Sequence, residues 1–472
     1  MKVKYRDLVE QTFDWPQEEF YLEKGQLHFH DIPMMDLVEK YGSPLKFSFL
    51  PKIGQNIEKA RGWFKSSMKK LKYKGNYHYC YVTKSSHFHF VMDEVLKTGA
   101  FLETSSAFDL DLVKSLHKQG KLKKNHTIIC NGFKREEYCK NISEMVADGF
   151  TNLTPILDNK NEVELLTEML SKKIKIGIRI ASEEEPKFEF YTSRLGVRYK
   201  DIPQFYNNQI KGNDKLELKM LHFFVNTGIR DSAYYWNELH KCLAVYCQMK
   251  KLCPTLDSLN IGGGFPVKNS LAFDFDFEYI IEEILSQIQL TCETEGVAVP
   301  DIFTEFGSFT VGDSGGVVFK IVGQKQQNDR EKWSFIDSSF MTTLPDSWAI
   351  SKRFLMLPLN RWEDAYERVF LGGLTCDSDD YYNSEQHVNA IYLPKHDANK
   401  PLYIGFFNTG AYQDSLSGYG GIHHCLIPQP RHILIDYDYE GNLQYRIFKD
   451  RQTAPEMLRI LGYESADNTS LS

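Results

Sequence analysis

Short apolar runs rich in β-branched and aromatic residues alternate with amphipathic stretches between about residues 77 and 305. The stretches at 232–252 and 276–290 carry apolar residues three and four positions apart, as helices require. Such alternation is typical of parallel βα units. Eight strand-like runs are found, at 77–84, 100–106, 126–132, 154–158, 175–180, 221–228, 256–264 and 301–307. Eight units over about 230 residues predict a closed β/α barrel, whose usual length is roughly 250 residues.

The pattern changes after about residue 310 to alternating strands with turn signals. In 432–448 the sequence Glu-Gly-Asn separates two alternating runs, which predicts a hairpin. The first 45 residues contain KGQLHF, a predicted hairpin arm that packs with the C-terminal domain. The predicted fold is therefore α/β plus β: an arm at 1–45, a (β/α)8 barrel at 46–312, and a β-sandwich or β-barrel-like domain at 313–472.

Composition narrows the class of protein. Of 472 residues, 42% are hydrophobic and 25% charged, and no apolar stretch is long enough to span a membrane. The charged N-terminus lacks the apolar run of a signal peptide, so a cytoplasmic location is expected. The net charge of −7 and a single short basic run, 69–74, disfavour nucleic acid as a partner. Nine cysteines without CxxC spacing predict neither disulfides nor zinc, and no metal site is expected.

Three features lie at predicted strand ends, where barrel active sites form. Lys84 ends the first strand; burial there would lower its pKa and favour the nucleophilic amine, although a surface lysine is the alternative. Gly262, Gly263 and Gly264 follow the seventh strand, as a phosphate loop or a simple tight turn. Glu305 ends the eighth and either faces a cationic ring nitrogen of a ligand or pairs with Arg179.

Two further segments carry polar groups. The sequence GLTCDSDDYY at 373–382 gathers Cys376, Asp377 and Asp380, either as functional groups or as a turn or acidic metal loop. The charged segment 182–194 follows the fifth strand and is interpreted as a lid or as a solvated excursion.

Taken in order, the motifs YVTKSS, ICNGFK, IGGGFP, TEFG, LTCDSDD and GAYQ resemble the fold-type III pyridoxal-phosphate decarboxylases, which act on ornithine, diaminopimelate or arginine. The resemblance covers about residues 75–420. The segments ICNGFKREEY, LPDSWAI and TCDSD are most similar to the biosynthetic arginine decarboxylases. The resemblance implies an alanine racemase-like barrel, pyridoxal 5′-phosphate as cofactor and an amino acid as the small-molecule substrate.

The resemblance also implies roles for single residues. Lys84 would carry the cofactor as a Schiff base, Glu305 would face its pyridine nitrogen, and Arg179 would order the barrel floor. The phosphate would be bound by Gly262–Gly264 and Tyr412.

Further implied roles fall on residues of the second domain. Cys376 would reprotonate the α-carbon and Asp377 would receive the cationic end of the substrate, both from the partner subunit of a homodimer with shared active sites. Asp337 and Asp380 are additional candidates for binding a guanidinium group.

Two positions depart from the family pattern. Phe224 stands where a histidine usually stacks on the cofactor ring, and it can still stack. Ser308 stands where an arginine usually contributes to the phosphate site, so one charged partner of the phosphate is missing.

The leading hypothesis is decarboxylation of L-arginine to agmatine, a step of polyamine biosynthesis. Citrulline, ornithine, meso-diaminopimelate and carboxynorspermidine are alternative substrates. An amino-acid racemase is disfavoured by the cysteine-aspartate segment. An inactive, partner-binding relative is disfavoured because Lys84, Glu305, Tyr412 and Cys376 are all retained.

Overall fold

The structure, a computed structural model, describes residues 3–183, 192–382 and 391–463. The chain divides into two compact units. The barrel unit comprises Ile53–Pro266 and Phe275–Thr310, and the β unit comprises Met1–Lys52, Val267–Asp274 and Val311–Ser472. Most of the segment interpreted as a lid, 184–191, lies outside the described residues.

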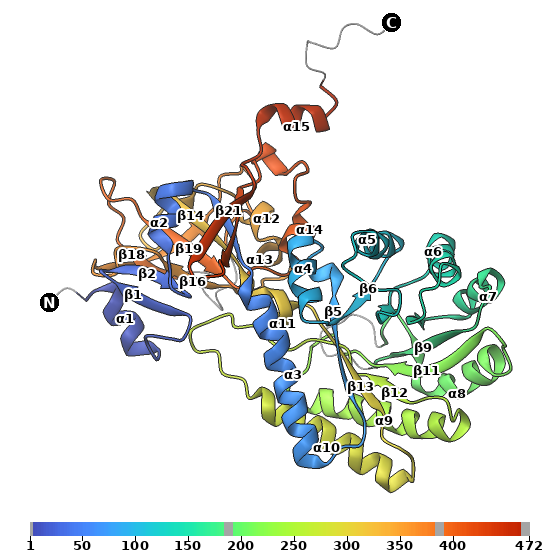
Figure 1. Cartoon of the computed structure of the whole chain (residues 1–472). Helices are drawn as coiled ribbons and strands as arrows, with labels where there is room; N and C mark the ends of the chain where they lie inside the picture. The colour runs from blue at the N-terminus through green and yellow to red at the C-terminus, as the bar shows by residue number, and fades with distance from the viewer. Residues whose placement is uncertain (1–2, 184–191, 383–390, 464–472) are drawn as a thin grey trace, which may run out of the picture. The chain divides into compact units, whose positions relative to one another are not determined.

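Eight parallel strands close the barrel unit. Each strand pairs with the next along the chain, and β13 pairs with β5 to complete the ring, so the eight-stranded barrel is confirmed. Figure 1 shows these strands surrounded by helices. The barrel strands are β5 (Tyr77–Val82), β6 (Phe101–Thr104), β7 (Ile128–Cys130), β8 (Leu153–Leu157), β9 (Ile174–Ala181), β11 (Leu216–His222), β12 (Ser258–Asn260) and β13 (Asp301–Phe306); the short β10 (Val197–Arg198) pairs with β9 outside the ring.

Two strands differ from the predicted ranges. The sixth was predicted at 221–228, but β11 ends at His222. The apolar residues after His222 lie beyond the end of the strand. Their hydrophobicity alone resembles that of a buried strand, so it extends the predicted range too far. The seventh was predicted at 256–264, but β12 ends at Asn260 because Gly262 and Gly264 adopt φ values of 69° and 106°, outside the β region.

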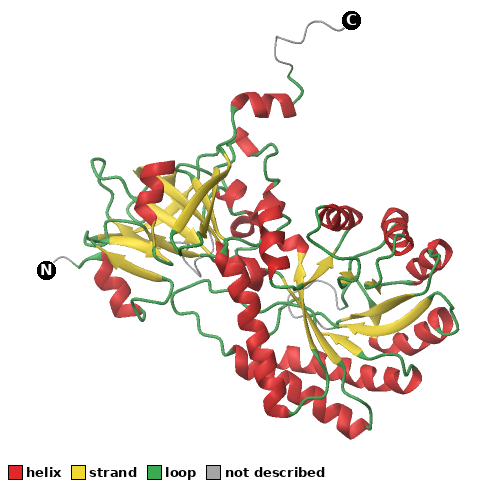
Figure 2. Ribbon diagram, in the orientation of Figure 1, coloured by secondary structure: helices red, strands yellow, loops and turns green. Residues whose placement is uncertain are grey.

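Helices connect consecutive strands and lie outside the barrel, as Figure 2 shows in red around the yellow strands. The predicted helices at 232–252 and 276–290 are confirmed as α9 and α10. Both have side-chain N-caps, from Ser232 and Asp276. The helices of this unit are α3 (Pro51–Leu71), α4 (His89–Lys97), α5 (Ala107–Lys118), α6 (Glu136–Ala147), α7 (Lys160–Met169), α8 (Ile202–Phe205), α9 (Ala233–Leu252) and α10 (Phe277–Glu295), with α11 (Ser308–Val311) at its end.

One layer of apolar side chains fills the barrel interior. It is a buried cluster of Cys80, Ile129, Ile156, Met220 and Phe303, each from a different strand. Side chains on a strand alternate between its two faces, so the residues two positions further along each strand also point inward. The apolar layer therefore fixes which residues form the next layer towards the carboxyl ends of the strands.

The β unit is built around β4, which lies between antiparallel β14 and parallel β20 in one sheet. The predicted hairpins at KGQLHF and at 432–448 are confirmed as β1–β2 and β20–β21. The strands are β1 (Phe20–Glu23), β2 (Gln26–Phe29), β3 (Ile32–Pro33), β4 (Leu45–Phe49), β14 (Gly315–Gln326), β15 (Lys332–Ile336), β16 (Leu355–Pro358), β17 (Tyr366–Gly372), β18 (Ile391–Pro394), β19 (Tyr403–Phe407), β20 (Arg431–Tyr437) and β21 (Leu443–Lys449). The helices are α1 (Tyr5–Thr12), α2 (Met34–Tyr41), α12 (Phe340–Thr343), α13 (Pro345–Ala349), α14 (Gln413–Ser417) and α15 (Ala454–Ile460).

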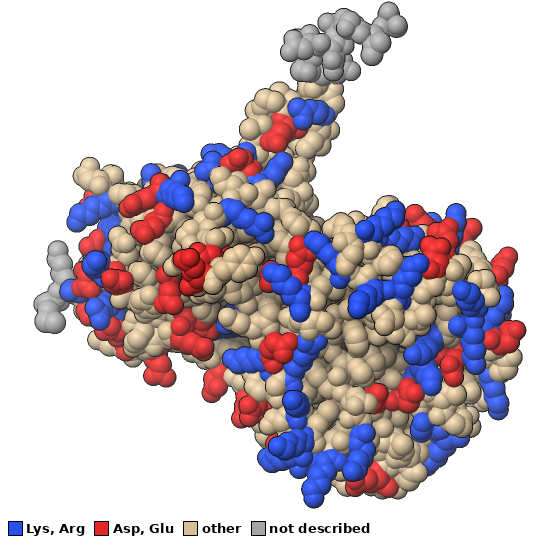
Figure 3. Space-filling model, in the orientation of Figure 1, with Lys and Arg blue, Asp and Glu red and all other residues tan. Residues whose placement is uncertain are grey.

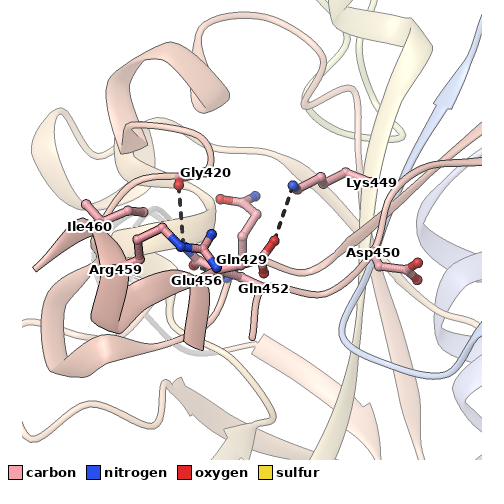
Figure 4. Close-up of a pocket in the computed structure, with 8 residues that line it drawn as sticks. All are labelled: Gly420, Gln429, Lys449, Asp450, Gln452, Glu456, Arg459 and Ile460. Carbon is pink, nitrogen blue, oxygen red and sulfur yellow. Dashed lines mark hydrogen bonds and ion pairs between the residues drawn. The ribbon is translucent and has the colours of Figure 1, made fainter. Parts of the chain in front are cut away.

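The helix α15 follows β21 and is attached by side-chain amides. Gln452 Nε2 donates to the carbonyl of Gly421 at 2.9 Å, and its Oε1 accepts from the backbone of Gln429 at 3.2 Å. Lys449 pairs with Glu456 at 3.5 Å. Figure 4 shows these side chains around a pocket of about 220 Å³, which the attachment leaves beside the helix.

Charged side chains of both signs are interspersed over the face seen in Figure 3. The surface also carries exposed pairs along single helices, such as Lys160 with Glu164 at 3.1 Å. Within the described ranges, no helix is both long and apolar enough to cross a membrane.

A fully buried ion pair ties the loop after β7 to α7. Lys134 is about 1% exposed; its Nζ donates to the carbonyl of Gly132 at 2.9 Å and lies 3.6 Å from Glu162 Oε2. The Glu162 carboxylate in turn accepts from the backbone amides of Lys134 and Asp158. Burial raises the pKa of Glu162, and Lys134 opposes that rise.

We expect Lys134→Met to lower the free energy of unfolding by about 3–5 kcal/mol, because it leaves a buried carboxylate without its cation. The matched control is Lys160→Met, which removes an exposed helix pair worth only about 0.3–0.5 kcal/mol. Urea unfolding of the three proteins measures both differences. Equal losses in the two variants would contradict a structural role for the buried pair.

Candidate active site at the barrel mouth

A ring of polar side chains lies directly above the apolar layer. Ile129, Met220 and Phe303 of that layer are each followed two positions later by a polar residue: Asn131, His222 and Glu305. The same two-residue step leads from other inward positions to the remaining members. We call the set the polar ring; it consists of Glu103, Asn131, Asp158, Arg179, His222, Asn260 and Glu305.

Glu305 is the centre of the polar ring. Asn131 Nδ2 donates to both of its oxygens, at 2.9 and 3.0 Å, and Asn260 Nδ2 donates to Oε1 at 2.7 Å. His222 Nε2 lies 3.0 Å from Oε2. Burial alone would raise the pKa of Glu305, but the charge and hydrogen bond of His222, with Asn131 and Lys84, lower it to about 2. The ring therefore holds a fixed negative charge in the barrel.

A second carboxylate of the ring lies beside Lys84. Glu103 is fully buried, and its Oε1 is 4.0 Å from Lys84 Nζ, whose side chain is half exposed. Burial raises the pKa of Glu103 to about 7; Lys84 opposes this rise and Glu305 adds to it. A carboxyl group that titrates near neutrality next to an amine can exchange a proton with that amine.

Arg179 supplies the positive charge of the ring. Burial lowers its pKa, while Asp158, Glu305 and Glu103 raise it. Its guanidinium carbon lies 5.8 Å from the ring centroid of Phe224. The ion-pair partner of Glu305 is His222. The predicted alternative, a direct pair between Glu305 and Arg179, is therefore replaced by a pair with histidine.

The glycine loop after β12 is packed against the backbone of Glu305. The Glu305 amide donates to the carbonyl of Gly262 at 2.8 Å, and a side chain on Gly263 would place its Cβ 2.0 Å from the Glu305 carbonyl oxygen. A side chain on Gly262 would place its Cβ 3.1 Å from Cδ2 of Phe224, so Phe224 lies directly beside this glycine. Within the part of the chain that the structure describes, the amides of Gly263 and Gly264 donate no hydrogen bond to the protein. They are free to bind an anion.

Several buried polar side-chain atoms of the ring have no hydrogen-bond partner in the protein. They include Oδ1 of Asn131, Nε of Arg179, Nδ1 of His222 and Oδ1 of Asp158. Buried polar atoms are nearly always hydrogen-bonded in folded proteins. Their convergence on one barrel mouth is what a polar ligand would satisfy.

The predicted residues of the β unit fall into two groups. Cys376 is exposed, and Asp377 is partly exposed and 3.5 Å from His424. Asp380 is buried instead; one carboxylate oxygen accepts from the Ser339 hydroxyl and the Phe340 amide, and the other accepts from the amide and hydroxyl of Thr375. It therefore holds the loop that carries Cys376.

Asp337 and Tyr412 are the other predicted site residues of the β unit. Asp337 Oδ1 accepts from the amide of Lys320 at 2.9 Å, and burial raises its pKa. Tyr412 has a φ of 68° and precedes α14. Ser308, in the barrel unit, is half-buried at the start of α11.

Sequence reasoning found Lys84, Arg179, Glu305 and the glycine loop but missed most of the polar ring. The missed residues are Glu103, Asn131, Asp158, His222 and Asn260. A usable signal was present, because each lies two positions after an inward residue of its strand. Among the described residues, no group of three or more potential ligands could hold a metal ion.

Comparison with known proteins identifies the family and the fold. Residues 56–312 match the family described as pyridoxal-dependent decarboxylase, pyridoxal binding domain. Biosynthetic arginine decarboxylase from Prochlorococcus marinus is 20% identical, over 90% of this chain and 83% of that protein. The crystal structure of biosynthetic arginine decarboxylase from Campylobacter jejuni has a TM-score of 0.78 at 19% identity, covering 98% of this chain and 91% of its own. Diaminopimelate decarboxylase from M. jannaschii has a TM-score of 0.77 at 16% identity, covering 94% and 97%.

The two carboxylates predict opposite pH effects on stability. The pKa of Glu103 is raised in the folded state from 4.5 to about 7, so its contribution to stability is lost as the pH rises through that value. We therefore expect Glu103→Gln to gain stability over the natural chain progressively between about pH 5 and pH 8.

Glu305→Gln is the matched control. The pKa of Glu305 is lowered to about 2, so its contribution is complete above the ordinary value of 4.5 and is lost only as the pH falls towards 2. Its stability difference should change less over the same range than that of Glu103→Gln, and the remaining change reflects the lost Glu305 charge, which raises the pKa of Glu103. Urea unfolding at a series of pH values, without bound ligands, measures both; a flat curve for Glu103→Gln would contradict the raised pKa.

Proposed function

The chain belongs to the family of pyridoxal-dependent decarboxylases, and on that premise we propose that it converts a basic L-amino acid, L-arginine, to agmatine and carbon dioxide. Pyridoxal 5′-phosphate is the cofactor. The observation that carries the proposal is the ion pair between Lys84 and Glu103, a carboxyl group whose pKa is raised to about 7. Glu103 lies in the same ring as Glu305, whose pKa is lowered to about 2. Arginine is preferred because the relatives named above include biosynthetic arginine decarboxylases.

The residues present fit this cofactor. When bound, pyridoxal phosphate supplies a conjugated ring whose protonated nitrogen accepts the electron pair left by the departing carboxyl group. Glu305 provides the fixed negative charge that keeps such a nitrogen protonated. The unpaired amides of Gly263 and Gly264 suit a phosphate, and Phe224 provides an aromatic face beside Gly262.

Additional phosphate contacts are proposed for Tyr412 and Ser308, whose hydroxyl groups can donate hydrogen bonds to phosphate oxygens. Ser308 brings no positive charge to this site. The backbone amides of the glycine loop therefore carry more of the anion binding than they would beside an arginine.

Proton handling begins at Lys84. The amine must be neutral to form a covalent bond with an aldehyde carbon, and an ammonium group cannot react. In this proposal Glu103 accepts a proton from Lys84 Nζ and later returns it. The half-exposed side chain of Lys84 leaves its Nζ accessible to a ligand, while Glu103 stays buried.

Substrate recognition is assigned to Asp377 and protonation to Cys376. The partly exposed carboxylate of Asp377 would bind the guanidinium group of arginine, and the Cys376 thiol would deliver a proton from Sγ to the α-carbon. Both would act in the site of the partner subunit of a homodimer. Asp380 and Asp337 are left out of this role because backbone groups already occupy their carboxylates.

We expect Lys84→Ala to abolish both the visible absorbance of the bound cofactor and the release of carbon dioxide, because the covalent attachment is lost. Lys160→Ala removes an exposed lysine of α7 and should retain both. Absorbance spectra of the purified proteins and a carbon dioxide assay measure the two properties. An unchanged spectrum in Lys84→Ala would contradict the assignment of this lysine.

We expect arginine to be the preferred substrate in a panel with ornithine, lysine, citrulline, meso-diaminopimelate and carboxynorspermidine. Asp377→Asn should raise the KM for arginine about tenfold or more, the scale of a charge-assisted hydrogen bond, and leave the KM for neutral citrulline nearly unchanged. Asp379→Asn, an exposed neighbour in the same loop, is the matched control. A higher kcat/KM for any other member of the panel would contradict the choice of arginine.

A further inference from the structure

The nine cysteines divide sharply by exposure. All nine lie within the described residues; seven are buried, and only Cys376 and Cys425 are exposed. These two belong to segments far apart in the sequence, the turn after β17 and the short helix His424–Leu426. Their Sγ atoms nevertheless lie 3.6 Å apart. The two thiols open to solvent are therefore each other's neighbours.

The residues next to the two cysteines make a second contact between the same segments. Asp377 Oδ2 lies 3.5 Å from His424 Nε2. On one side, the buried Asp380 holds the turn through the amide and hydroxyl of Thr375, at 3.1 and 2.7 Å. The segment that carries Cys376 is therefore anchored one residue before the cysteine, and the juxtaposition does not depend on the sulfur atoms alone.

We propose that Cys376 and Cys425 form a site of reversible disulfide formation, with hydrogen peroxide as the oxidant. A disulfide has an S–S distance of about 2.05 Å, so the sulfurs need to approach by only about 1.5 Å. One thiolate attacks peroxide, which gives a sulfenic acid and hydroxide. The other thiol then attacks that sulfur, forms the S–S bond and releases water. The two thiols together lose two electrons, peroxide is reduced to two waters, and a dithiol reverses the change.

The consequence for activity rests on the proposed function. If Cys376 delivers a proton to the α-carbon, the disulfide removes that proton donor and stops turnover. Reduction restores the donor. Cys425 has no step of its own in decarboxylation.

The test treats the purified holoenzyme with a small excess of hydrogen peroxide, followed by alkylation, proteolysis and mass spectrometry. We expect a peptide pair linked through Cys376 and Cys425, and a fall in carbon dioxide release of about 100-fold, the scale of losing a positioned proton donor. Dithiothreitol should restore both the free thiols and the activity. Cys425→Ser should form no linked peptide and should keep most of its own activity under the same treatment.

Other outcomes separate this inference from the proposed function. Separate oxidation of the two cysteines without a linked peptide would overturn the disulfide site. So would equal inactivation of the natural chain and Cys425→Ser. A linked peptide in a protein that releases no carbon dioxide from any amino acid would support the disulfide site and overturn the proposed function. Cys376→Ser gives the same mapping from the other side, since it should also lack the linked peptide.

Discussion

The two-residue period of a β-strand is the constraint on which the candidate site depends. Once the apolar layer of Ile129, Met220 and Phe303 points inward, the residues two positions later must point inward as well. Burial of that layer is favourable through the hydrophobic effect, and it forces Asn131, His222 and Glu305 into the same enclosed space. The polar groups are therefore buried in the barrel because the apolar side chains two positions earlier on the same strands pack in its interior.

Burial then makes the two carboxylates chemically different. Glu305 has close hydrogen-bond partners in Asn131, Asn260 and His222. Burial would raise its pKa, but His222, Asn131 and Lys84 lower it to about 2. Burial raises the pKa of Glu103 to about 7, because it outweighs the charge of Lys84 at 4.0 Å and the hydrogen bond from Asn131. Ser105 Oγ also donates to Glu103 Oε1, at 3.2 Å. One carboxylate is a permanent charge and the other a proton acceptor near neutral pH, although both lie in one ring.

Patterns within short segments could be predicted from the sequence, whereas meetings between distant segments could not. The barrel, both β hairpins and the positions of Lys84 and Glu305 follow from periodicity and motif order. The sixth strand was placed too late because Phe223 and Phe224 are apolar but lie beyond its end. His222 lies outside the recognised motifs. It was missed because its importance depends on a contact with Glu305, which lies 83 positions further along the chain. The same holds for Cys376 and Cys425, which no local spacing connects.

The contact between Gly263 and the carbonyl of Glu305 has a further meaning for ligand size. The loop that offers free amides and the strand that carries the carboxylate are joined backbone to backbone, with no side chain between them. A ligand that contacts both the loop amides and the carboxylate must therefore fit a fixed distance between them. In the proposed site this spacing would limit the length of the ligand, and side-chain changes elsewhere in the barrel would alter charge without altering that spacing.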